Sequence, residues 1–163
     1  MERLGVDYER VKEVNSEIIY CSLSSFGQDG PYRNRVAHDL NCVSLSGLLD
    51  LTRSKNKDPA VPGFPISDIA GGLFSVFSII SALYDRDLND SGGEYIDISM
   101  LEALISFSSG SLSWIPLFED EAPKARETDF TGKYPCYDFY ETKDEKYITL
   151  AALEPNFGSD FAI

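Results

Sequence analysis

The apolar positions of the chain follow two patterns, one typical of buried strands and one with helical spacing. Residues 17–23 (EIIYCSL) and 94–100 (EYIDISM) are short apolar runs that predict strands. From Asp68 onwards, apolar residues at helical spacing predict a long helix with one continuously buried face, formed by Ile69, Leu73, Val76, Phe77, Ile80, Leu83 and Tyr84. A strand, helices, a second strand and a further helix predict an α/β fold with a mostly parallel sheet.

Shorter segments add three helices to this outline. Asp7 can cap a short helix near the start of the chain, and residues 38–51 predict a helix with His38 at its beginning. Ser99 and Glu102 have the spacing of a capping box and predict a helix directly after the second strand.

The pattern changes in the last third of the chain and predicts a second unit. We expect residues 1–115 to form a large domain, residues 116–133 a linker, and residues 134–163 the start of a smaller α+β domain. The smaller domain opens with two β-rich runs joined by the charged turn TKDEK, which predict an antiparallel hairpin. Because the chain stops within a fresh apolar run at Ile163, we expect it to be a fragment of a longer protein.

Composition and charge narrow the functional classes. The 163 residues are 43% hydrophobic, which suffices for a sizeable core. Twenty-seven acidic against 14 basic residues give a net charge of −13, which disfavours nucleic acid and anionic membrane surfaces as partners. The cysteines Cys21, Cys42 and Cys136 lack CxxC spacing, and the N-terminal residues lack an apolar signal core. We therefore expect a soluble, cytoplasmic protein with reduced thiols.

The motifs of several common enzyme classes are absent from the sequence. It contains no GxSxG, no P-loop and no GxGxxG after a strand, and one histidine with scattered cysteines predicts no metal site. His38, the only histidine, lies one helical turn before Cys42, so a Cys–His nucleophile is one alternative. The other is structural: a buried cysteine that packs, and an imidazole that begins a helix.

Asp68 has a structural and a chemical explanation. An aspartate at a helix start is commonly an N-cap or first-turn residue, favoured by the helix dipole. However, Gly71 and Gly72 follow it closely, although glycine is unfavourable inside helices. We expect these glycines to let an anionic ligand approach the backbone, which makes both of them candidate ligand-binding residues.

Five ordered segments together resemble family III CoA-transferases, the CaiB/BaiF family, which includes formyl-CoA and carnitine CoA-transferases and 2-methylacyl-CoA racemases. The segments are YCSLSSFGQDGPY, AHDLN, AVPGFPISDIAGG, GGEYIDISMLEA and YITLAALEPNF. The resemblance covers nearly the whole chain, but only the middle of the longer family members. It implies a Rossmann-like large domain, a small α+β domain, an interlocked homodimer, and a coenzyme A thioester as substrate with no permanently bound cofactor.

The resemblance also implies roles for three residues. In the transferases, the aspartate that matches Asp68 is a nucleophile and forms an aspartyl-CoA thioester. In the racemases, the residues that match His38 and Asp68 are acid/base groups on opposite faces of the substrate α-carbon, and the residue that matches Glu154 assists the histidine. The glycines after Asp68 could then expose N–H groups to a developing enolate oxygen.

The two enzymatic branches and one inactive alternative stay open at this point. A nucleophilic transferase needs only the aspartate, whereas His38, Asp68 and Glu154 are all present, which favours a 2-methylacyl-CoA racemase. Two departures affect the acyl pocket: Ala37 stands where glycine is commoner, and Cys42 replaces an aromatic residue. An inactive fragment or a binding subunit is the third possibility.

Overall fold

The computed structural model describes residues 1–54, 58–112 and 124–154, and of residues 111–112 only the backbone. Two compact units can be distinguished, Met1–Ser46 with Gly63–Phe107, and Gly47–Pro62 with Ser108–Ile163. Residues 116–123 of the expected linker lie outside the described residues, so the domain boundaries predicted from the sequence stay a prediction.

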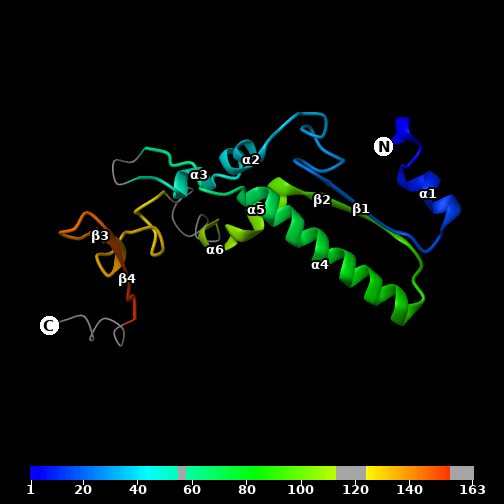
Figure 1. Cartoon of the computed structure of the whole chain (residues 1–163). Helices are drawn as coiled ribbons and strands as arrows, with labels where there is room; N and C mark the ends of the chain where they lie inside the picture. Colours follow the sequence, from blue (N-terminus) through cyan, green and yellow to red (C-terminus); the bar gives the residue numbers. More distant parts are fainter. Residues whose placement is uncertain (55–57, 113–123, 155–163) are drawn as a thin grey trace. The chain divides into compact units, whose positions relative to one another are not determined.

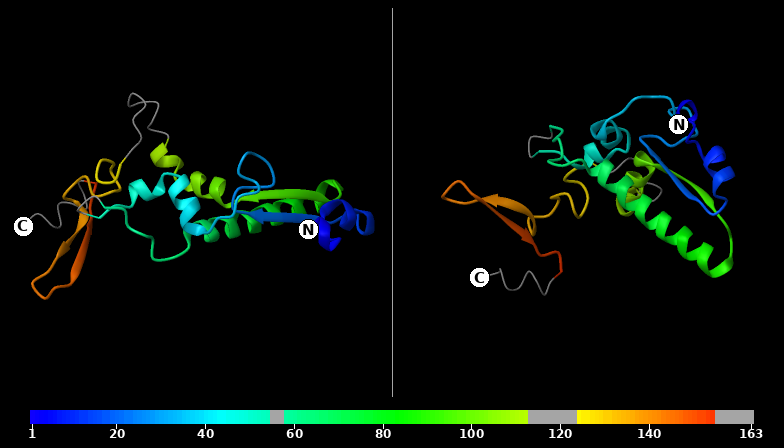
Figure 2. Two further views of the ribbon diagram at one scale, coloured as in Figure 1. Left: turned by 90° about the horizontal axis from the view of Figure 1, so that it is seen from above. Right: turned by 45° about the vertical axis from the view of Figure 1, so that its right-hand side comes forward.

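A parallel pair of strands forms the centre of the first unit. Strand β1 (Ile19–Ser24) pairs in parallel with β2 (Glu94–Ser99), in a register that runs from Ile19 opposite Glu94 to Ser24 opposite Ser99. Helix α4 (Ile66–Asn89) lies alongside the two strands (Figures 1 and 2). The predicted strands, their parallel pairing and the long helix between them are confirmed.

Two of the predicted helix starts are confirmed by their hydrogen bonds. Helix α1 (Tyr8–Val14) follows the short 3-10 helix η1 (Glu2–Leu4), and the Asp7 carboxylate caps α1 by accepting from the Arg10 backbone N–H at 3.3 Å. Helix α5 (Met100–Phe107) begins directly after β2, and the Ser99 hydroxyl accepts from the Glu102 backbone N–H at 3.2 Å.

The single helix predicted over residues 38–51 is wrong. The structure has two short helices there, α2 (Asp39–Leu45) and α3 (Leu48–Leu51). Between them Gly47 has a φ of 78°, a left-handed conformation that interrupts an α-helix and that glycine adopts at low cost. Helical periodicity continues across the break, and this is why the apolar pattern did not reveal it.

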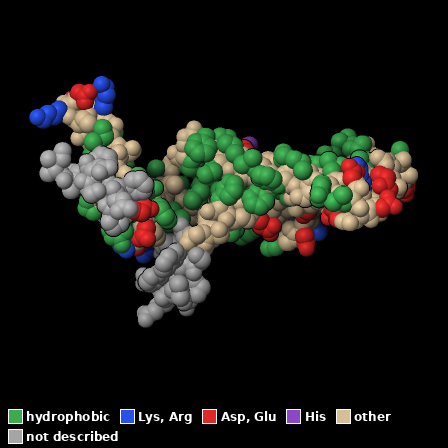
Figure 3. Space-filling view, turned by 90° about the horizontal axis from the view of Figure 1, so that it is seen from below, with side chains coloured by type: hydrophobic (Ala, Val, Ile, Leu, Met, Phe, Trp, Pro, Cys, Tyr) green, Lys and Arg blue, Asp and Glu red, His purple; other side chains and the backbone are tan. Residues whose placement is uncertain are grey.

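The predicted burial of the apolar face of α4 is also wrong for the described residues. Ile69, Val76 and Phe77 are 47, 54 and 67% exposed, and Ile80 and Tyr84 are similarly open. The buried positions of α4 are instead Ser67, Ala70, Gly71 and Ala82. Helix α4 contacts β1, β2, α2 and α5, and small residues on the contact side permit a close approach. Hydrophobic side chains are therefore visible on the surface of the molecule in the space-filling view (Figure 3).

By length and composition alone, α4 could also cross a membrane. It has 24 residues, with a mean hydropathy of 1.8 in its most apolar window, of which 22% is buried. A long helix of a soluble α/β protein meets the same criteria. Its contacts with both strands and with two helices are those of a helix in an α/β unit.

The second unit contains the predicted hairpin. Strand β3 (Tyr137–Glu141) pairs antiparallel with β4 (Tyr147–Ala151), and residues 142–146 form the turn. Arg126 precedes the hairpin in sequence, and its guanidinium forms an ion pair at 2.7 Å with Asp138 of β3. The described part of this unit also includes α3 and α6 (Ser109–Leu112).

The closest packing of α4 occurs at Gly71. A Cβ atom built there would lie 2.7 Å from Met100 Cγ and 2.9 Å from Leu23 Cδ1, both shorter than ordinary van der Waals contact. A Cβ atom at the neighbouring Gly72 would meet nothing within 4 Å. The two adjacent glycines therefore have different environments, one packed against β1 and α5 and the other open.

This difference predicts opposite effects of alanine at the two positions. Gly71→Ala should lower the free energy of unfolding by about 1–3 kcal/mol, because a methyl group overpacks the contact with Met100 and Leu23. Gly72→Ala should leave it unchanged or raise it by up to about 1 kcal/mol, because alanine favours the helix. Urea unfolding followed by circular dichroism measures both. Equal effects of the two substitutions would contradict the packing assignment.

Candidate functional site

The start of α4 is held by a carboxylate from another helix. Asp39 is the first residue of α2, and its Oδ1 atom accepts three hydrogen bonds from α4. The donors are the Ser67 backbone N–H at 2.6 Å, the Ser67 hydroxyl at 2.7 Å and the Asp68 backbone N–H at 3.3 Å. Since Pro65, the N-cap residue of α4, provides no side-chain cap, Asp39 supplies the cap from a distant part of the chain.

This arrangement removes the capping explanation for Asp68. Asp68 is the third residue of α4 and is exposed. Its backbone N–H is capped by Asp39, and within the described ranges no hydrogen bond or ion pair to its own carboxylate is found. The helix dipole still favours a negative charge at this place. The structure therefore presents an exposed carboxylate at a helix start, uncommitted to the cap.

His38 lies next to this contact between α2 and α4, because it is the residue before Asp39. It is the N-cap residue of α2, is exposed, and its backbone N–H donates to Asn41 Oδ1 at 2.9 Å. Because His38 is adjacent to Asp39, and Asp39 is hydrogen-bonded to the backbone of Asp68, the structure brings the helix starts that carry His38 and Asp68 together. The sequence had identified both residues but not the contact between their helices.

Cys42 is a packing residue in this structure. Its side chain is fully buried, and its thiol donates to the Ser25 carbonyl at 3.7 Å. Burial raises the pKa of the Cys42 thiol, and the negative charges of Asp39 and Asp68 raise it further, whereas a hydrogen bond with Ser67 lowers it. A thiol with a raised pKa is a poor nucleophile at neutral pH. The geometry therefore does not support the Cys–His alternative.

The two candidate ligand-binding glycines differ in the space that they leave for a ligand. Gly71 is buried against β1 and α5, whereas Gly72 lies one turn after Asp68 on the same face, with open space around it. The N–H groups of both lie beyond the first turn, where a helix uses its N–H groups internally. Their role in ligand binding stays a prediction, and only Gly72 offers space for a ligand beside Asp68.

Glu154 lies in the other unit. It follows β4 by a few residues and is exposed. The assistance that Glu154 is expected to give to His38 stays a prediction. Across the part of the chain that the structure describes, no group of three or more His, Cys, Asp or Glu residues could hold a metal ion.

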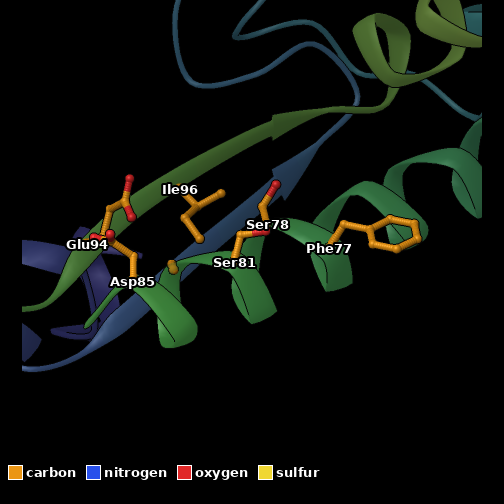
Figure 4. A pocket seen from close by; sticks show the side chains of 7 residues that line it. Phe77, Ser78, Ser81, Asp85, Glu94 and Ile96 are labelled. Carbon is orange, nitrogen blue, oxygen red and sulfur yellow. The ribbon is translucent and has the colours of Figure 1, made fainter. Parts of the chain in front are cut away.

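Two cavities lie in the first unit. A small one of about 160 Å³ lies between the loop after β1 and helix α2, and is lined by Phe26, Tyr32, Arg35, Val36, Asn41 and Leu45. A larger, open one of about 530 Å³ lies between α4 and β2, where Figure 4 shows Phe77, Ser78 and Ser81 on the helix and Glu94 and Ile96 on the strand. Phe77 is about 13 Å further along the helix axis than Asp68, so the larger cavity lies away from the helix start.

Sequence reasoning missed the two residues that form the contact between α2 and α4, Asp39 and Ser67. Each precedes or follows a residue that was identified, in the pairs His38–Asp39 and Ser67–Asp68. The sequence contains no signal for a distant cap, because Ser67 and Asp68 are themselves residue types that commonly cap helices. Nothing local indicates which acidic residue provides it.

Comparison with known proteins finds a matching protein family and related enzymes. The family described as CoA-transferase family III matches residues 1–162. Human alpha-methylacyl-CoA racemase is 34% identical over 158 residues, covering 96% of this chain and 41% of the relative. Human succinyl-CoA:glutarate CoA-transferase is 30% identical over 152 residues, covering 93% of this chain and 34% of the relative. The chain thus spans less than half the length of these relatives.

A solved structure agrees with these matches. The crystal structure of a CaiB/BaiF family protein from Brucella suis superposes with a TM-score of 0.80 at 29% identity, over 92% of this chain and 39% of that one. The fold, the ordered motifs and the match over nearly every residue lead to one assignment. The chain belongs to CoA-transferase family III.

Proposed function

We propose that the protein is a 2-methylacyl-CoA racemase, which inverts the α-carbon of a CoA thioester by 1,1-proton transfer. The observation that carries the proposal is the exposed Asp68 carboxylate, freed from capping by Asp39, on a helix start joined to the one that carries His38. Racemisation needs two proton-transfer groups, and the two adjoining helix starts carry a carboxylate, on Asp68, and an imidazole, on His38. The relative named alpha-methylacyl-CoA racemase supports the same choice.

The proposed reaction uses the two groups on opposite faces of the α-carbon. For one enantiomer, the Asp68 carboxylate accepts the α-proton, the thioester becomes an enolate, and protonated His38 donates a proton to the other face. The opposite enantiomer uses the same groups in reverse. Glu154 would assist His38, and the open space at Gly72 would leave room for the thioester beside Asp68. After one inversion Asp68 is protonated and His38 is neutral, which is the form that acts on the opposite enantiomer. Proton exchange of the two groups with water restores the starting form.

A CoA-transferase is the second candidate. In that reaction Asp68 attacks the thioester carbonyl and forms a mixed anhydride with release of the CoA thiolate. The thiolate then attacks the aspartyl carbonyl, which releases the first carboxylate and leaves an aspartyl-CoA thioester. A second carboxylate attacks this thioester, and the returning CoA thiolate attacks the new acyl carbonyl, which yields the new CoA thioester and frees Asp68. The exposed carboxylate and the relative named succinyl-CoA:glutarate CoA-transferase favour this candidate. His38 is dispensable in it, which separates the two reactions experimentally.

The remaining parts of the proposal concern the setting of the reaction. We propose that the substrate is a CoA thioester, with no permanently bound cofactor, and that the complete protein is an interlocked homodimer in the cytoplasm. Family membership supports the substrate class and the dimer. The three cysteines, Cys21, Cys42 and Cys136, are free thiols, which is compatible with a reducing compartment.

Under both candidate reactions, Asp68→Asn in the complete protein should abolish most activity. The amide keeps the shape of the side chain but cannot accept a proton or attack a thioester, so turnover should fall at least about 10²-fold. Stability should change little, because Asp39 caps α4. Turnover of a CoA thioester and thermal unfolding measure the two effects. Asp87→Asn, an exposed aspartate near the other end of α4, is the matched control. Near-wild-type turnover of Asp68→Asn would remove this residue from the mechanism.

His38→Gln should separate the racemase from the transferase. In D₂O, a racemase incorporates deuterium at the α-carbon of a 2-methylacyl-CoA, and the variant should lose exchange from at least one enantiomer. Mass spectrometry and NMR of the recovered thioester measure this exchange. A wild-type protein without α-exchange, together with an acyl group on Asp68 that hydroxylamine traps, would establish the transferase instead.

A further inference from the structure

We infer that Asp39 is a positioning residue for the reaction at Asp68, because its carboxylate fixes the helix start that carries Asp68 against the helix start that carries His38. The inference rests on the proposed function, and it assigns Asp39 a role that acts through Asp68 and not on the substrate.

The hydrogen-bond geometry is the first argument. One oxygen of Asp39 accepts from both the N–H and the hydroxyl of Ser67, at 2.6 and 2.7 Å, and from the N–H of Asp68 at 3.3 Å. The two shorter distances are typical of charge-assisted hydrogen bonds, which are stronger and more directional than neutral ones. A second contact, from the Ser67 hydroxyl to the Asp39 carbonyl at 3.3 Å, joins the same two residues.

The residues around this contact are closely packed. Ser67 is fully buried, and so is Cys42, which follows Asp39 on α2 by about one turn. Buried side chains in close packing have few alternative rotamers. The contact therefore cannot shift without disturbing both helices, and the backbone of Asp68 has one well-defined place relative to α2.

The location of the contact is the second argument. A cap formed within α4 would stabilise the helix equally well without fixing its relation to α2. Here the capping residue is the immediate neighbour of His38, and one of the capped N–H groups belongs to Asp68 itself. Loss of the contact would thus allow the two proton-transfer groups to move relative to each other, and misplacement by about 1 Å can cost about 10²-fold in rate.

Two substitutions at Asp39 separate positioning from charge. Asp39→Ala removes all three acceptor contacts, so we expect kcat for α-proton exchange to fall at least about tenfold, with KM for the CoA thioester within about threefold of wild type. Asp39→Asn keeps one carbonyl oxygen that can accept the same hydrogen bonds, so it should retain most of the exchange rate lost by Asp39→Ala.

A third variant tests whether any lost cap has the same effect. Asp7 is also an aspartate that caps a helix of the first unit, but that helix is α1, where its carboxylate accepts from the Arg10 backbone N–H. Asp7→Ala should leave kcat unchanged even where it lowers the temperature of unfolding. The amide proton of Ser67, followed by NMR, adds a readout independent of turnover: it should move upfield in Asp39→Ala and shift far less in Asp39→Asn.

The outcomes distinguish this inference from the proposed function. Wild-type kcat in Asp39→Ala, equal losses in Asp39→Asn and Asp39→Ala, or an equal loss in Asp7→Ala would each overturn the positioning role. A wild-type protein without α-exchange would overturn the racemase proposal. Asp39 is then measured through the acyl group that hydroxylamine traps on Asp68, whose yield should fall in Asp39→Ala and recover in Asp39→Asn. Unchanged trapping, or no acyl group in the wild type, would overturn the inference as well.

Discussion

A single carboxylate oxygen, Oδ1 of Asp39, holds the starts of α2 and α4 together in the first unit. It satisfies N–H groups at the start of α4 that would otherwise lack a partner, and it does so from the start of α2. Because α4 also packs along both strands, the contact ties two helix starts to the same end of a parallel sheet. Ligand sites of α/β proteins are commonly built where helices begin beyond the carboxyl ends of parallel strands. Here that place receives an imidazole and a carboxylate.

Local patterns predicted the elements of the fold well, and their partners less well. The strands, the hairpin and the caps at Asp7 and Ser99 depend on residues close together in sequence, and the structure confirms them. The parallel pairing of β1 with β2, also confirmed, was predicted from the order of the elements. The break at Gly47 was missed because an apolar period can continue in register across one left-handed residue. The exposed face of α4 was assigned to the core because periodicity identifies an apolar face without identifying what covers it.

The site shows the same division between local and distant information. His38 and Asp68 were found from residue type and position, but Asp68 could equally have been a cap until the structure assigned that role to Asp39. This contact spans 28 residues, and no periodicity or spacing rule links positions so far apart. Gly71 and Gly72 were likewise one pair in the sequence, and only the neighbours of each show that one is required for packing and the other is open.

The break at Gly47 also marks the point where the chain leaves the first unit, to which it returns at Gly63. Residues 47–62 therefore belong to the second unit, although along the chain they connect α2 with α4, two helices of the first unit. A change of sequence or length within these residues therefore need not move Asp39 or Ser67, which both lie in the first unit.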